Sequence, residues 1–251
     1  DRRRLPDIRE GEYEALEQKL KNPDFEPDFG PSVFNPKAGA TAVGARDFLL
    51  AYNVNLNTRD VKIASKIANR VREKGRMVTD RETGKKSQVP GTCAGVQGMG
   101  WYIPEYEMAQ ITVNILNYHE TPLWKVFEEC ERFAAEFGVR VTGSELVGMV
   151  PLQALTDVGL HCLQKQGGSP GAHERELVRL AIQSLGLSEI APFVPEERIV
   201  EYRLAGAAPL AAMGVSAFVD ELSSLSPAPG GGSVAALAGA LSAGLSTMVG
   251  N

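Results

Sequence analysis

Cysteine is scarce in this 251-residue sequence, and Cys93, Cys130 and Cys162 lie far from one another. They form no CxxC pair, and no histidine follows them at zinc-finger spacing. We therefore expect neither a disulfide framework nor a structural zinc site, and we predict no bound metal. Free thiols are typical of a reducing compartment, which predicts a cytoplasmic protein.

The sequence also lacks an excess of positive charge. Its 26 Lys and Arg residues are outnumbered by 31 Asp and Glu residues, which gives a net charge of -5 at pH 7 and a pI of about 5.4. A nucleic-acid-binding domain normally carries net basic charge, so we expect no nucleic-acid partner. The content of 43% apolar and 23% charged residues is typical of a globular protein with a sizeable core.

Both ends lack the signals of a natural terminus. The chain starts with Asp1 and three arginines instead of a methionine and an apolar run, so no signal peptide is visible. An apolar run over 234–249 continues almost to the last residue, and we expect both ends to lie inside a longer polypeptide. That run approaches the ~20 residues of a membrane-spanning helix, but small and hydroxyl residues dilute it. We favour a tightly packed helix and no membrane partner.

The middle of the chain switches between strand and helix patterns. Phe48–Leu56 alternates apolar and polar residues as a strand does, and Asp60 can cap a following helix. The predicted elements are a strand at 48–56, a helix at 60–74, strands at 94–103 and 109–118, a helix at 121–137 and a strand at 139–146. This order predicts an α+β fold of ferredoxin-like type, βαββαβ, with two helices on one face of an antiparallel sheet.

Further elements flank this unit. We predict a helix at 10–21, a Gly/Pro-rich loop at 23–45, a basic loop at 76–90, extra helices at 151–165 and 172–185, and an extended segment at 197–204. An Ala/Gly/Pro linker at 205–214 precedes a helix at 215–222, which opens a second, all-helical domain.

One loop combines residues suited to a flat, anionic small molecule. It runs Gly30, Pro31, Ser32, Val33, Phe34, Asn35, Pro36, Lys37, Ala38, Gly39. Its glycines let backbone N–H groups approach a ligand, the phenyl ring can stack on a planar ring, and the lysine can bind a carboxylate. The same composition also suits a stiff hinge between domains. The loop does not match the glycine patterns of nucleotide-binding sites.

Two other segments have one functional and one structural interpretation each. Arg59–Lys86 contains ten Lys or Arg residues and could attract a polyanion, although charge runs commonly just face solvent. Pro229–Ser233 is a glycine-rich turn before a helix. Such a turn presents free N–H groups to an anion, or it simply starts a helix of a bundle.

The three histidines do not form a catalytic group in the sequence. His161 and His173 lie in or beside predicted helices, where a structural role is the simpler interpretation, and His119 follows a strand at a sheet edge. No Ser/His/Asp or Cys/His arrangement can be assembled. These observations alone assign no catalytic residue, and a catalytic role of His119 at that edge stays open.

A series of short motifs resembles a known family. In order, they are DFGPS at 28–32, GATAVGAR at 39–46, VQGMGWY at 96–102, GSELVGMVPL at 143–152, LGL at 185–187, APF at 191–193 and ERIVEY at 197–202. Together they resemble the glutamate formiminotransferases over Leu5 to about Leu204. The segment APGGGSVAA at 228–236 resembles the start of the all-helical cyclodeaminase family, which follows the transferase in a bifunctional enzyme.

The resemblance implies a folate enzyme of histidine degradation. Such an enzyme transfers a formimino group from N-formiminoglutamate to tetrahydrofolate, and then cyclises 5-formiminotetrahydrofolate to 5,10-methenyltetrahydrofolate with release of ammonia. It also implies a homo-oligomer with two ferredoxin-like transferase subdomains and folate in the cleft between them, where the loop Gly30–Gly39 would be the folate-binding segment. The basic stretch Arg59–Lys86 would favour a folate with a polyglutamate tail.

The resemblance implies four parts. Residues 1–44 would end the first transferase subdomain, 45–204 would form the second, 205–214 would be a linker, and 215–251 would start the cyclodeaminase domain. The family's catalytic histidine lies upstream of the folate loop and its deaminase aspartate lies downstream of the last residue here. His119 does not correspond to that histidine, and we expect this segment alone to be inactive. Two other interpretations stay open: a non-catalytic ferredoxin-like module that binds folate or an amino acid, and a domain used only for assembly.

Overall fold

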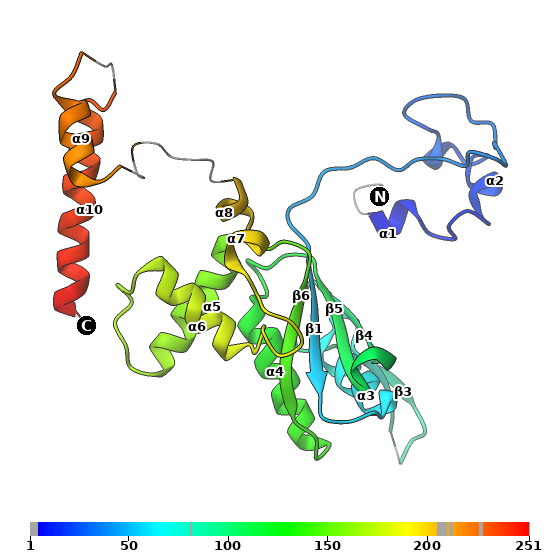
Figure 1. Ribbon diagram of the computed structural model, residues 1–251. Coiled ribbons are helices and arrows are strands. Elements are labelled where there is room, and N and C mark those ends of the chain that lie inside the picture. The colour runs from blue at the N-terminus through cyan, green and yellow to red at the C-terminus, as the bar shows by residue number, and fades with distance from the viewer. Residues whose placement is uncertain (1–4, 81, 205–209, 211–212, 226–227, 251) are drawn as a thin grey trace. The chain divides into compact units, whose positions relative to one another are not determined.

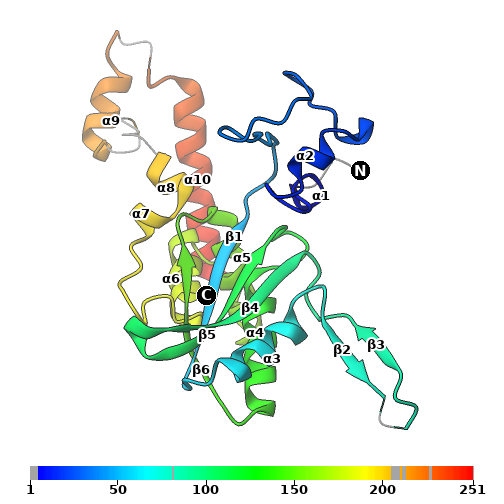
Figure 2. The same cartoon turned by 90° about the vertical axis from the view of Figure 1, so that its right-hand side faces the viewer.

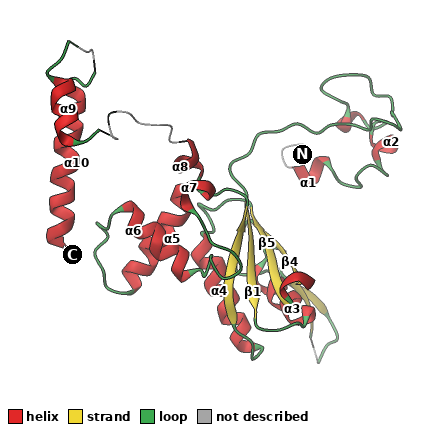
Figure 3. Ribbon diagram, in the orientation of Figure 1, coloured by secondary structure: helices red, strands yellow, loops and turns green. Residues whose placement is uncertain are grey.

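A computed structural model describes residues 5–80, 82–204, 210, 213–225 and 228–250. The chain divides into two compact units, Asp1–Asp47 and Phe48–Asn251. The element labels below follow Figure 1, and Figure 3 shows helices, strands and loops in the same orientation.

The first unit contains little regular structure. It holds the short helices α1 (Leu5–Ile8) and α2 (Leu16–Lys19) and a 3-10 turn at Pro23–Phe25, and the rest of its described residues, from 5 to 47, form turns and loops. The expected continuous helix over 10–21 is wrong. Gly11 and Glu12 have φ angles of +74° and +49°, and a left-handed pair of this kind interrupts a right-handed helix.

The second unit is built on a four-stranded sheet. Its strands are β1 (Leu50–Leu56), β4 (Val96–Ile103), β5 (Met108–Ile115) and β6 (Val141–Val147), arranged in the order β4-β5-β1-β6 with every neighbouring pair antiparallel. Helix α3 (Val61–Val71) connects β1 to β4, and α4 (Leu123–Glu136) connects β5 to β6. This is the predicted ferredoxin-like arrangement, and the prediction is confirmed.

Helices α3 and α4 cover the same face of the sheet (Figures 1 and 2). The apolar positions of the strands point to these helices and form the core, which includes Leu50, Tyr52, Val54, Ile111 and Val113. Gly100 lets α3 approach closely, because a Cβ there would lie 2.2 Å from the backbone nitrogen of Ser65. The predicted cap of α3 is present, since the Asp60 carboxylate accepts a hydrogen bond from the Lys62 backbone N–H at 2.8 Å.

The segment predicted as a basic loop contains a β-hairpin instead. Strands β2 (Arg76–Thr79) and β3 (Lys86–Val89) pair antiparallel and project from the sheet (Figure 2). In the connecting turn, the Asp80 carboxylate accepts hydrogen bonds from the backbone N–H groups of Glu82 and Thr83 and from the Thr83 hydroxyl. These bonds lower the pKa of Asp80. The hairpin was missed because its short strands are mostly exposed and lack an apolar alternation.

Four helices follow β6. They are α5 (Leu152–Lys165), α6 (Glu174–Ser184), α7 (Pro195–Arg198) and α8 (Val200–Leu204), and α5 packs against α6, α4 and α8. The predicted extended segment over 197–204 is therefore wrong. Ile199 alone is extended and forms a β-bridge with Val150 between the two short helices. Its burial and a hydrogen bond from the Leu152 N–H to the Glu201 carboxylate fix the segment, so tertiary contacts outweigh the strand preference of Val200.

After α8, the described residues form α9 (Val215–Leu222) and α10 (Gly231–Gly250). The predicted helix at 215–222 is confirmed, while most of the predicted linker at 205–214 lies outside the described residues. By length and composition alone, α10 could cross a membrane over Gly231–Val249, and none of that stretch is buried in the structure. The same features fit a bundle helix of a soluble domain.

Candidate functional site

The predicted ligand loop lies in the first unit and is held by its own backbone and by Tyr13. The Asn35 side-chain oxygen accepts hydrogen bonds from the N–H groups of Lys37 and Ala38, both at 3.0 Å. The Gly39 N–H donates to the Asn35 carbonyl at 2.8 Å, and the Tyr13 hydroxyl donates to the Pro36 carbonyl at 2.7 Å. The second half of the loop is therefore a defined turn.

The phenyl ring of Phe34, which was expected to stack on a planar ligand, is not the most accessible apolar group here. The Phe34 ring is half-buried and lies 5.6 Å from the Tyr13 ring, centroid to centroid, so part of its surface is already used. Phe29 is 95% exposed and Val33 is 72% exposed. These two side chains, with the exposed Lys37, offer the accessible apolar and cationic surface of the loop.

The second unit presents the sheet face opposite α3 and α4, which we call the open face. Strand register places its side chains in three rows of four. The first row is Gly143, Asn55, Gln110 and Trp101, the second is Glu145, Asn53, Thr112 and Met99, and the third is Val147, Ala51, Asn114 and Gln97. Polar groups occupy the centre of this face, and Trp101, Met99 and Val147 at its two edges are each about half exposed.

A chain of amide groups runs along the first row. The Gln110 side-chain nitrogen donates to the Asn55 oxygen at 2.7 Å, and the Asn55 nitrogen donates to the Glu189 carboxylate at 2.6 Å. Asn55 and Gln110 are fully buried. The turn after α6 covers this end of the face, and Gly143 makes room for it, because a Cβ there would lie 2.6 Å from a Glu189 carboxylate oxygen. Buried amides that are paired in this way hold the Glu189 carboxylate in place.

The second row places a carboxylate, that of Glu145, on the edge strand β6 of the open face. The Asn53 side-chain nitrogen donates to Glu145 at 3.3 Å, and both side chains are half-buried. Within the described part of the chain, no lysine or arginine forms an ion pair with Glu145. A partly desolvated carboxylate without a cation is unusual in a structural role.

Two shallow cavities flank Glu189. One, of about 600 Å³, is lined by Thr142, Arg179, Gln183 and neighbouring residues, and the other, of about 300 Å³, is lined by Asn57, Arg59, Glu107 and others. Thr142 and Glu189 line both cavities. Arg179 already pairs with Glu176 at 2.6 Å, and Arg59 pairs with Glu107 at 2.9 Å. Both arginines are therefore partly neutralised.

The basic stretch 59–86 does not act as one charged surface. Arg59 pairs with Glu107, and Arg70 lies 4.5 Å over the Phe137 ring. Arg72 donates to the Gly98 carbonyl at 3.2 Å. The exposed cations that remain on the hairpin and beside it are Lys74, Lys85 and Lys86. The interpretation as a solvent-facing charge run and the interpretation as a polyanion-binding segment each describe part of this stretch.

The histidines lie away from the open face rows. His161 stacks on Trp124 with ring centroids 3.9 Å apart, and its Nε2 lies 2.8 Å from a Glu128 oxygen that also accepts from Lys165. His173 is the N-cap of α6, where its Nδ1 accepts from the Arg175 N–H at 3.2 Å. His119 is exposed, with its ring 4.0 Å from that of Tyr118. The structure brings no pair of histidines together.

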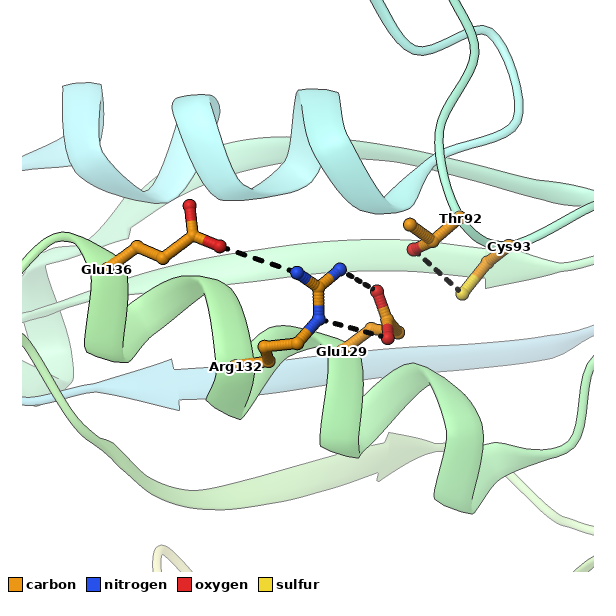
Figure 4. A network of polar contacts seen from close by, with 5 residues as sticks. All are labelled: Thr92, Cys93, Glu129, Arg132 and Glu136. Atoms are coloured by element: carbon orange, nitrogen blue, oxygen red, sulfur yellow. Dashed lines mark hydrogen bonds and ion pairs between the residues drawn. The ribbon is translucent and has the colours of Figure 1, made fainter.

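A polar network on α4 also has a structural role, because it joins side chains along one helix (Figure 4). Arg132 donates to Glu129 at 2.5 Å and to Glu136 at 3.4 Å, and these bonds span successive turns of one helix. Beside it, Thr92 contacts the Cys93 sulfur at 3.8 Å. Burial raises the pKa of the Cys93 thiol, which keeps it protonated and a poor nucleophile. Among the described residues, no group of three His, Cys, Asp or Glu could hold a metal ion.

The glycine-rich turn 229–233 leads into α10, which begins at Gly231. No described contact shows a ligand role for this turn. The residues that the sequence interpretation missed are Asn53, Asn55, Gln110 and Glu145 on the open face. Their signal was present, because they occupy the polar positions of alternating strands, but the face they share appears only once the strand order is known.

Three family models match this chain. A family model described as "Formiminotransferase domain" matches residues 51–205, and the model of its N-terminal subdomain matches residues 1–46. The chain belongs to the formiminotransferase family. A third model, described as "Formiminotransferase-cyclodeaminase", matches residues 214–251.

Named relatives agree with this assignment. The formimidoyltransferase-cyclodeaminases of Dictyostelium discoideum and Rattus norvegicus are each 46% identical over 99% of this chain. The glutamate formimidoyltransferase of Thermoplasma acidophilum is 41% identical over 64% of this chain and 48% of its own length. The chain spans about 45% of the length of the bifunctional relatives.

Proposed function

We propose that this chain is part of a bifunctional folate enzyme. Its first reaction moves a formimino group from N-formiminoglutamate to N5 of tetrahydrofolate. The carbon–N5 bond forms and the carbon–nitrogen bond to glutamate breaks, while N5 loses a proton and the glutamate amine gains one. The second reaction closes the ring to 5,10-methenyltetrahydrofolate and releases ammonia. The proposal rests on family matches that cover both a transferase and a cyclodeaminase model in one chain.

Within this function, the loop Gly30–Gly39 is the folate-binding segment. Hydrogen bonds to Asn35 define its turn, and the exposed Val33, together with Phe29 just before the loop, supplies apolar surface for a pterin or benzoyl ring. Lys37 is placed to bind a carboxylate of the glutamate moiety. The greater exposure of Phe29 and Val33 supports a contact of these two side chains with the ligand at least as much as one of the half-buried Phe34.

Calorimetry with 5-formyltetrahydrofolate, a stable folate, tests this site. We expect Lys37→Ala to weaken binding about 5- to 20-fold through loss of one charge-assisted hydrogen bond, and Phe29→Ala to weaken it by a similar factor. Lys21→Ala, an exposed lysine in the same unit, is the matched control. Absence of binding by the unaltered chain, or equal binding by all variants, would favour the assembly interpretation.

A polyglutamylated folate is the second ligand to compare. The exposed lysines 74, 85 and 86 on and beside the β2–β3 hairpin retain uncompensated positive charge and suit a chain of carboxylates. We expect the triple exchange of these lysines for glutamine to remove any preference for pentaglutamylated over monoglutamylated folate. Monoglutamate binding should not change.

The matches also support a division of the chain. We propose that residues 1–44 end one transferase subdomain, 45–204 form the next, 205–214 link, and 215–251 begin a helical cyclodeaminase domain in which α10 is a packed bundle helix. Buried thiols at Cys93 and Cys130 suit the cytoplasm. A homo-oligomer is the expected state, and light scattering on the longest natural polypeptide that contains these residues would measure it.

A further inference from the structure

The open face carries negative but no positive charge. Glu145 is the one ionisable side chain in its three rows, and Glu189 adds a second carboxylate at one end. Neither forms an ion pair with a described lysine or arginine. Glu145 is half-buried, so its charge is less well solvated than that of a surface glutamate. A ligand that completes this site should bring a cation.

The proposed formimino donor contains such a cation. Its formimino carbon is part of an amidine, and amidines are strong bases that stay protonated at neutral pH. We propose that Glu145 binds the amidinium group of the donor and is the residue that distinguishes a formimino from a formyl compound. This inference rests on the proposed function and assigns the donor to the open face of this sheet.

The geometry of the second row suits a planar cation. An amidinium presents N–H groups in a plane, as a guanidinium does, and a carboxylate accepts them as parallel hydrogen bonds. The Asn53 amide holds one carboxylate oxygen from the neighbouring strand at 3.3 Å, which fixes the carboxylate from the side. Trp101 and Met99 lie on β4, at the opposite edge of the same face, with β5 and β1 between them and β6, so at roughly 14 Å from Glu145 they do not contact the same cation.

The amidinium is the part of the donor that this charge selects. N-formiminoglutamate also carries two carboxylates, as the glutamate end of folate does, and neither finds a cation in the three rows. The loop Gly30–Gly39 carries the exposed Lys37, which suits a carboxylate.

A pair of isosteric ligands tests Glu145. N-formiminoglutamate and N-formylglutamate have nearly the same shape, but the first carries an amidinium and the second a neutral carbonyl. In the longest natural polypeptide that contains these residues, we expect Glu145→Gln to raise the KM, and the calorimetric Kd, of N-formiminoglutamate about 10- to 100-fold. Its effect on the inhibition constant of N-formylglutamate should be less than about 3-fold.

Two further variants control for folding and position. Glu145→Asp keeps the charge but withdraws it by one methylene, so it should give a smaller loss than the glutamine variant. Glu105→Gln removes an exposed carboxylate from the turn between β4 and β5 and should match the unaltered protein. Equal losses for both ligands, or an unchanged KM for the formimino compound in Glu145→Gln, would overturn the inference.

Folate binding separates this inference from the proposed function. If Glu145→Gln binds 5-formyltetrahydrofolate normally and transfers with an unchanged donor KM, the inference fails while the function stands. If the unaltered protein binds the donor through Glu145 but neither binds folate nor transfers, the function fails while the inference stands. If the unaltered protein does not bind the formimino donor, both fail.

Discussion

Along β1, Leu50, Tyr52 and Val54 are sealed beneath the helices, whereas Ala51 and Asn53 between them stay half-exposed on the open face. The same contrast holds for charge. On the helix side, Glu128 accepts hydrogen bonds from Lys165 and His161, and Glu129 accepts from Arg132, while Glu145 on the open face has only an amide neighbour in the described contacts. The carboxylates described on the helix side pair with cations of the chain, and the open face leaves a carboxylate for a ligand.

This difference predicts that stability is concentrated on one face and binding on the other. The largest expected loss of stability is therefore at the closest helix contact. Gly100→Ala should lower the free energy of unfolding by about 3 kcal/mol or more, because the added Cβ would lie 2.2 Å from a backbone nitrogen of α3. Urea unfolding measures it. Met99→Ala, the adjacent open-face position on β4, should cost about 1 kcal/mol or less, and a similar loss in both variants would break the comparison.

The next effect concerns the apolar core beneath the helices. Ile111 is fully buried, so Ile111→Ala should cost about 2–4 kcal/mol through lost burial and a residual cavity. Thr112→Ala, its neighbour on the open face, should cost less than about 1 kcal/mol. Thermal and chemical unfolding of the two variants compares the faces at adjacent positions of one strand.

A smaller loss of stability is expected in the first row of the open face, which the turn after α6 covers. Asn55→Leu would break the amide chain and leave the Gln110 and Glu189 groups without their partner, at a cost of about 1–3 kcal/mol. Asn53→Leu in the next row should cost less, because its surroundings remain half-exposed to water. Equal destabilisation by the two variants would show that the second row is as closed as the first.

Low pH should reduce stability through a carboxylate on the helix side of the sheet. Burial raises the pKa of Glu128, but hydrogen bonds from Lys165 and His161 outweigh it, and the net pKa is lowered. A carboxylate with a lowered folded-state pKa adds stability above its unfolded pKa, and this is lost as pH falls through the folded-state value. We expect Glu128→Gln to be less stable than the unaltered chain by about 1 kcal/mol or less at pH 6, since the side chain is 37% exposed, and the gap should close near pH 3.

The smallest effect is expected at Glu145. Replacing this carboxylate by glutamine should change the free energy of unfolding by less than about 0.5 kcal/mol, because no cation loses its partner. Differential scanning calorimetry at pH 7 measures it. A large loss would mean that Glu145 has a structural role, which would remove the contrast between the two faces.

The sequence predicted the ferredoxin-like unit because its strands alternate clearly, as from Leu50 to Leu56, and its helices carry recognisable caps such as Asp60. The sequence-based prediction failed at segments where the residue preferences for helix or strand, or a weak apolar pattern, did not match the structure. Gly11 and Glu12 break a segment of good helix formers, and the hairpin at 76–89 lacks an apolar face. Ile199 and Val200 suggest a strand, but Ile199 is a single extended residue between two short helices and Val200 begins α8.

The two candidate sites also differ in how far the sequence could predict them. Local composition was enough to indicate the loop Gly30–Gly39, since glycine, an aromatic ring and a lysine occur together within ten residues. The carboxylate of Glu145 could not be found from its own neighbours. Its amide partner Asn53 is 92 residues away in the chain, and sheet order brings the two side chains together.

The molecule carries an optical reporter on each side of its sheet. Of its two tryptophans, Trp124 stacks on His161 on the helix side, and Trp101 stands half-exposed at the edge of the open face. Emission from Trp101 in a Trp124→Phe variant would follow ligands that arrive at the sheet without any added label. Emission from Trp124 in a Trp101→Phe variant would follow the docking of α5 onto α4. Ligand binding at the open face and docking of the helices can thus be recorded separately with these two variants.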